Sequence, residues 1–271
     1  MWRLFCVFLL CCSGPLLAAP ALTLKSARQT VTYELATLQG QSGLRGITIP
    51  NDVAYNRSMQ YQALPLAPLL RQAGFQPGDQ LRLVALDGFA MTADAAPFLN
   101  EQGAQAWLAV ENPQAPWPPL KPGKPGAGPL YVVWTHPEQG KVTAEMWPYQ
   151  LAMIDRVAPL EERFPMLLPD AALPRQGAVW QGFAHFKQHC LACHSLNKGG
   201  DARLGPDLNV PYNPTEYLGE RFLRQLIRDP KSLRWWEKGQ MPALSAQSLS
   251  DAQLGELLQY LQHMAGRKVT P

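Results

Sequence analysis

The chain has 271 residues, of which 46% are hydrophobic and 17% are charged, and its formal net charge at pH 7 is +3. This length suits two domains, and the composition excludes an intrinsically disordered chain because enough apolar residues are present to form packed cores. The small net charge argues against nucleic acid as a partner, since such partners require a strongly basic surface.

The N-terminal residues 1–21 have the features of a secretory signal peptide. Arg3 supplies one positive charge, residues 4–12 form an apolar run, and Gly14-Pro15 breaks the run before an Ala19-x-Ala21 site. We therefore expect cleavage near Ala21, export to a Gram-negative type of periplasm, and no membrane span in the mature protein. The alternative is an uncleaved segment that tethers the protein to the membrane, but a span needs about 20 apolar residues.

Residues 22–158 show the pattern of an α+β domain with a mixed sheet. Alternating apolar and polar residues predict strands at 29–35, 81–86, 106–110 and 130–134. A short apolar helix is expected at 66–73, where Gly74 ends it, and Asp94 is placed to open another short helix. Residues 112–129 are rich in Pro and Gly, which predicts a long surface loop.

Parts of this domain resemble the molybdopterin-binding domain of the sulfite-oxidase family. The resemblance lies in the segment from Ala63 to Gly74, in the strand ending at Asp87-Gly88-Phe89, in the strand that begins at Gly128-Pro129, and in Trp147-Pro148-Tyr149. That family holds molybdenum through a cysteine thiolate, a soft ligand. Residues 22–158 contain no cysteine, so the resemblance implies the fold without the metal.

The polar residues of this domain do not identify a ligand. Asp87-Gly88 matches a turn at the end of a strand, and His136 beside Pro137 is typical of a solvated loop tip. Asp94, Glu111 and Glu145 belong to no catalytic motif. The following residues 159–174 contain four prolines, which disfavour a continuous helix and predict an extended linker between two domains.

Cys190-Leu191-Ala192-Cys193-His194 has the C-x-x-C-H pattern that marks covalent attachment of a c-type haem. Two thiols on one helical turn reach the two vinyl groups of the haem and form thioethers, and His194 presents its imidazole to the iron. The other cysteines fall within the predicted signal peptide, so the mature chain keeps only this pair. Alternative interpretations of the motif are a C-x-x-C redox pair or half of a zinc site.

Residues 175–271 resemble the class I cytochromes c, an all-α family. Gly182 and Phe186 lie on the predicted helix before Cys190, and Leu257 and Tyr260 lie on a terminal helix that begins with a capping box at Ser250. In that family these positions allow the two helices to cross closely. A third helix is expected from Asn213 to Asp229, with Pro and Glu in its first turn.

The same resemblance implies the haem surroundings. The loop Gly205-Pro206 approaches the proximal side, where the Pro206 carbonyl accepts the second ring N–H of His194. The loop at Gly239-Gln240-Met241 presents Met241 as the sixth iron ligand. Trp235 and Trp236 precede this loop and are candidates for packing on the haem edge.

We predict an exported cytochrome with one covalent haem, whose iron is held by His194 and Met241. Such ligation leaves no vacant position and favours transfer of single electrons, to or from a dehydrogenase or another respiratory partner. One alternative is the haem-containing subunit of an oxidoreductase in which residues 22–158 bind a cofactor or substrate. Another is a haem-based sensor, and whether the chain is itself an enzyme stays open.

Overall fold

The computed structural model describes residues 21–233, 235, 239 and 241–269. Residues 1–20 of the predicted signal peptide lie outside this range. The strands are β1 (Ala21–Lys25), β2 (Thr30–Glu34), β3 (Arg45–Asp52), β4 (Arg57–Pro65), β5 (Gln80–Ala85), β6 (Ala90–Asp94), β7 (Gln105–Val110), β8 (Leu130–Thr135) and β9 (Leu151–Val157). The α-helices are α1 (Leu35–Gln39), α2 (Leu66–Gln72), α3 (Ala95–Phe98), α4 (Leu160–Arg163), α5 (Ala178–His189), α6 (Pro214–Tyr217), α7 (Gly219–Arg228), α8 (Pro230–Leu233) and α9 (Asp251–Ala265), and the 3-10 turns are η1 (Pro137–Gln139), η2 (Ala144–Met146) and η3 (Pro165–Leu167).

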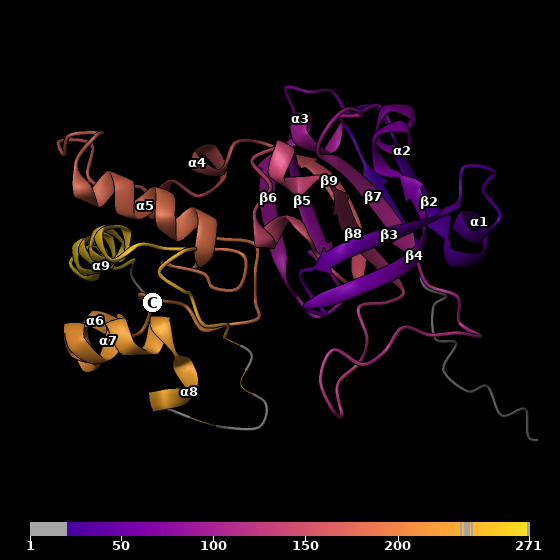
Figure 1. Ribbon diagram of the computed structural model, residues 1–271. Helices are drawn as coiled ribbons and strands as arrows, with labels where there is room; N and C mark the ends of the chain where they lie inside the picture. Colours follow the sequence, from indigo (N-terminus) through magenta and orange to yellow (C-terminus); the bar gives the residue numbers. More distant parts are fainter. Residues whose placement is uncertain (1–20, 234, 236–238, 240, 270–271) are drawn as a thin grey trace, which may run out of the picture.

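The N-terminal domain is built on two sheets, shown in indigo to magenta in Figure 1. One sheet has the strand order β2-β1-β9-β5-β6, with β1 and β9 parallel and its other pairs antiparallel. The second is antiparallel, with the order β3-β4-β7-β8. The prediction of a mixed sheet is therefore confirmed.

Sequence patterning found only some of these strands. The predicted strands correspond to β2, β5, β7 and β8, whereas β1, β3, β4, β6 and β9 were not predicted. The predicted short helix is α2, and Gly74 follows it with φ +95°, as a helix-ending glycine should. Helix α3 follows Asp94, but the Asp94 side chain makes no capping hydrogen bond.

Helices α5 and α9 form the centre of the C-terminal domain (Figure 1). A Cβ atom on Gly182 would lie 2.0 Å from the backbone oxygen of Glu256, so only glycine permits this crossing. Phe186 and Tyr260 pack beside it with ring centroids 5.3 Å apart, and both side chains are buried. The predicted Ser250 capping box is present at the start of α9.

The third predicted helix is divided into two. The Asn213 capping box opens α6 as expected, but Gly219 adopts φ +70° and separates α6 from α7. Asp229 ends α7, and the short helix α8 follows at once. The glycine explains the difference, because a positive φ cannot continue a right-handed helix.

The proline-rich segment 159–174 is not extended throughout, because it contains α4 and η3. Leu160 and Leu167 are buried in the same apolar cluster as α5 and α9, and Leu167 also accepts a hydrogen bond of 2.7 Å from the Tyr260 hydroxyl. The segment therefore packs on the C-terminal domain. No helix in the described residues is long and apolar enough to cross a bilayer.

Candidate haem site

The two mature cysteines lie where α5 ends. Cys190 is the C-cap residue of α5, and the amides of Cys193 and His194 both donate to its carbonyl, at 3.1 and 2.9 Å. This turn holds both thiols, which are free, immediately before His194. Burial raises the pKa of Cys190 to about 12 and that of Cys193 to about 11, so both are protonated at neutral pH.

The imidazole of His194 is held in one orientation and one tautomer. Its Nδ1 lies 2.8 Å from the Pro206 carbonyl oxygen, which is the contact that the sequence predicted. A carbonyl can only accept, so Nδ1 carries the proton and Nε2 keeps its lone pair. Burial lowers the pKa of His194, which favours the same neutral form.

Gly205 allows the proximal loop to approach the imidazole. A Cβ atom at Gly205 would lie 2.5 Å from Cε1 of His194, and the Gly205 amide donates to the Cys193 carbonyl at 2.7 Å. The absence of a side chain therefore lets the loop close over the ring. This contact also ties the loop directly to the attachment motif.

Asp207 organises the rest of this loop. Its carboxylate accepts from the Ser195 hydroxyl at 2.9 Å and from the amides of Lys198, Asn209 and Val210 at 2.7 to 2.8 Å. Burial alone would raise the pKa of Asp207, but these donors outweigh it and hold the pKa below its ordinary value. The ionised carboxylate therefore fixes the backbone on both sides of Pro206.

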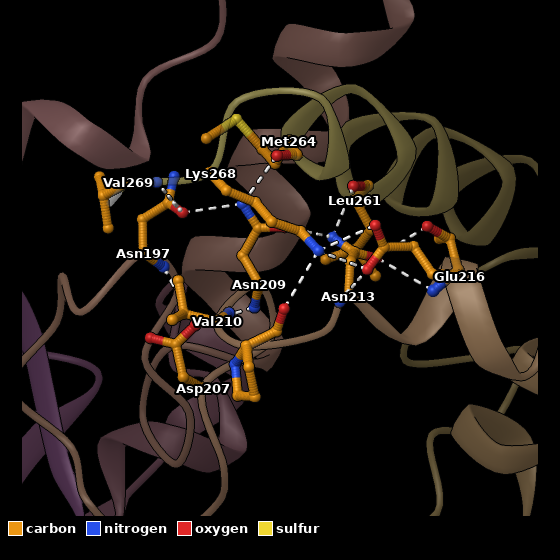
Figure 2. A network of polar contacts seen from close by, with 12 residues as sticks. Asn197, Asp207, Asn209, Val210, Asn213, Glu216, Leu261, Met264, Lys268 and Val269 are labelled. Atoms are coloured by element: carbon orange, nitrogen blue, oxygen red, sulfur yellow. Dashed lines mark hydrogen bonds and ion pairs between the residues drawn. The ribbon is translucent and has the colours of Figure 1, made fainter. Parts of the chain in front are cut away.

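Three buried asparagines connect the loop to α9 (Figure 2). The Asn213 amide group donates to Asn209 at 2.8 Å, and that of Asn209 donates to Asn197 at 2.8 Å. Asn213 and Asn209 also donate to the carbonyls of Leu261 and Met264. Only the capping role of Asn213 is evident in the sequence, because the partners on α9 lie far along the chain.

The predicted distal residues are only partly described. Met241 lies between α8 and α9 with 36% of its surface exposed, and Trp235 is 71% exposed. Trp236 lies outside the described residues. The Leu244 amide donates to the Ile227 carbonyl at 3.0 Å, which anchors this segment to α7. The approach of Met241 to the iron stays a prediction.

The other histidines of the C-terminal domain have partners away from His194. His185 lies 2.9 Å from a carboxylate oxygen of Glu256, and Nε2 of His263 accepts from the Asp170 amide at 3.1 Å. Met264, on α9, is buried in the apolar cluster that α9 forms with α5. These side chains therefore serve contacts between elements of the domain.

Two acidic residues of the N-terminal domain lie beside the motif, which the sequence did not indicate. Asp87 occupies the expected turn, where it accepts from the Phe89 amide at 3.0 Å and Gly88 has φ +93°. Glu145 on η2 lies 3.5 Å from Nδ1 of His189, the residue before Cys190. His136, by contrast, is an exposed tip next to Glu138, as expected.

The two domains meet at the attachment motif and at an ionic cluster. The edge strand β6 donates from the Ala90 amide to the Ala192 carbonyl at 3.2 Å. Asp201 of the C-terminal domain bonds to both Arg82 and Arg163, at 2.7 Å each. Because these side chains are largely buried, the contact holds the motif against the edge of the sheet.

Residues 179–265 match the family model Cytochrome c. The match begins at the second residue of α5 and ends at the last residue of α9. The C-terminal domain is therefore a cytochrome c domain, with covalently bound haem c, an electron-transfer function and hence a redox partner. The two free thiols and the available Nε2 of His194 fit one such haem.

Proposed function

We propose that the protein is an exported cytochrome with one haem c, held by thioethers to Cys190 and Cys193 and by His194 and Met241 at the iron. The observation that carries this proposal is the contact between His194 Nδ1 and the Pro206 carbonyl, at 2.8 Å. It orients the imidazole and leaves Nε2 as the ligating atom. The bound haem supplies a one-electron couple.

The residues around the motif hold the His194 ring in one orientation. Asp207 and the asparagine network hold the proximal loop, so the ring of His194 cannot rotate away. A thioether supplied by Met241 to a bound haem would favour the reduced iron and raise the potential. A closed site of this kind suits electron transfer more than the binding of small molecules at the iron.

Replacing Met241 tests the ligand assignment. We expect Met241→Ala to abolish the weak near-infrared sulfur-to-iron band of the oxidised protein and to let the reduced protein bind carbon monoxide. Met264→Leu is the matched control, because Met264 is a buried packing residue and the replacement conserves its volume. Survival of the band in Met241→Ala, or its loss in Met264→Leu, would show that the assignment is wrong.

For location and partner, we propose the periplasm and a dehydrogenase or another respiratory redox protein. The support is the signal-like N-terminal sequence and the electron-transfer role of the cytochrome domain. The N-terminal sequence of protein purified from the periplasmic fraction tests cleavage near Ala21. A mature protein that begins at Met1 and stays with the membrane would favour the tethered form.

We also propose that the N-terminal domain shares the fold of the sulfite-oxidase molybdopterin domain without its metal, and that the C-terminal domain is all-α. The support is the mixed sheet, the absence of cysteine from residues 22–158, and the series of helices α5 to α9. Metal analysis of the purified protein should give one iron per chain and no molybdenum. Stoichiometric molybdenum would contradict this proposal.

A further inference from the structure

The N-terminal domain packs directly on the haem-attachment motif. Besides the bond between Ala90 and Ala192, the Arg203 amide donates to the Gly88 carbonyl at 3.3 Å. Ala192 is itself buried within the apolar cluster of the N-terminal domain. The turn at residues 87–89 and the start of β6 therefore cover one side of the motif.

Two carboxylates are carried to the motif by this contact. Asp87 directly precedes Gly88, whose carbonyl accepts from the Arg203 amide. The Asp87 carboxylate stabilises this turn by accepting from the Phe89 amide. Glu145 meets His189, whose side chain is only 6% exposed and which directly precedes Cys190. Glu145 is thereby held in a partly buried position, whereas Asp87 is exposed to solvent but fixed within its turn.

The two carboxylates lie next to the residues that would carry the haem. Glu145 lies beside His189, which precedes Cys190, and it lines one cavity together with Leu191 and Ala192 of the motif. Asp87 lies three residues before Ala90, whose amide donates to the carbonyl of Ala192, between the two cysteines. A haem attached to Cys190 and Cys193 would therefore lie close to both negative charges.

We propose that the N-terminal domain acts as an electrostatic cover of the haem, in which Asp87 and Glu145 lower its reduction potential. This proposal rests on the proposed function, because it requires a haem at Cys190 and Cys193. The oxidised haem carries one more positive charge than the reduced haem. Negative groups held close to it stabilise the oxidised form.

A positive charge near the motif opposes the effect of the two carboxylates on the reduction potential, so it must stay the same in every variant. The guanidinium group of Arg203 lies in the same contact and donates to the carbonyls of Gly200 and Ala202. Arg203 is unchanged in the Asp87 and Glu145 variants, so differences in their reduction potentials reflect the loss of the carboxylate charges.

The test is the reduction potential of the purified, haem-loaded full chain with Asp87→Asn or Glu145→Gln. Asparagine keeps the oxygen that accepts from the Phe89 amide, so the turn is preserved. We expect each variant to favour reduction about threefold over the native protein, a rise of about 28 mV for a one-electron couple, and the double variant to exceed both. Glu138→Gln is the control, because Glu138 is an exposed acid of the same domain.

The near-infrared band and the visible spectrum separate charge from structure. A rise in potential with unchanged spectra, together with a potential close to the native value in Glu145→Asp, supports the proposal. Shifts no larger than that of Glu138→Gln would overturn it, as would shifts that occur only together with loss of the band. A chain that retains no haem after denaturation and acid–acetone extraction would instead refute the proposed function.

Discussion

Gly182 is the position where a single added carbon should have the largest structural consequence. In Gly182→Ala, the new Cβ would lie 2.0 Å from the Glu256 oxygen and 2.7 Å from Cβ of Tyr260. The first of these atoms belongs to the backbone, so it cannot move aside as the end of a flexible side chain can. Helices α5 and α9 must therefore separate along their contact.

The magnitude follows from two opposing effects. Forcing a methyl group into a packed contact costs about 3 kcal/mol at the upper end of the usual range. Replacing glycine by alanine within a helix returns about 1 kcal/mol. We therefore expect a net loss of about 2 kcal/mol in the free energy of unfolding of the cytochrome domain.

The assay is urea unfolding of the haem-loaded protein, followed by far-ultraviolet circular dichroism. Gly255→Ala provides a matched control on α9, because a Cβ there meets only the end of the Arg224 side chain, at 3.6 Å. That variant should gain about 0.5 to 1 kcal/mol from helix propensity alone. If Gly182→Ala proves as stable as Gly255→Ala, the close crossing of α5 and α9 is wrong.

Three further predictions concern the proximal loop and the domain contact. Gly205→Ala should displace the His194 ring, and a changed Soret spectrum or a lower haem content of the purified protein would reveal it. Because the pKa of Asp207 is lowered on folding, its contribution to stability is present above the unfolded value of about 3.9 and is lost as pH falls through the folded value. Asp207→Asn should therefore show a smaller acid-induced loss of stability below about pH 4 in urea titrations, and an equal loss in both proteins would contradict this. Asp201→Asn should lower the free energy of unfolding by about 2 kcal/mol in the same assay, because it leaves two largely buried arginines without the carboxylate that they share. An unchanged unfolding midpoint would show that this ionic cluster does not stabilise the protein.

Short-range patterns predicted the local features of both domains well. The capping boxes at Asn213 and Ser250 and the helix-ending Gly74 involve residues within one or two turns of each other. Such interactions depend on the local sequence and hardly on the rest of the fold. The break at Gly219 was missed because glycine can occupy a helix interior as well as a position with positive φ.

The sheet strands were predicted less completely. Strand β9 pairs with both β1 and β5, and its partners lie far away in the sequence. Strands β3 and β4 carry many polar side chains, whereas β7 and β8 are almost continuously apolar and buried. Pairing across the chain, and not local preference, made these segments strands.

The sequence by itself determined the chemistry of the C-x-x-C-H motif, the Pro206 contact of His194 and the need for glycine at position 182. Each of these features depends on residue types at short spacing, or is implied by the resemblance to the class I cytochromes c. Only the tertiary structure placed Asp87 and Glu145 beside the motif and joined Asn197, Asn209 and α9 in one network. These contacts unite segments that are distant in the sequence, so no local pattern records them, and the energy of burial and hydrogen bonding in the folded chain decides them.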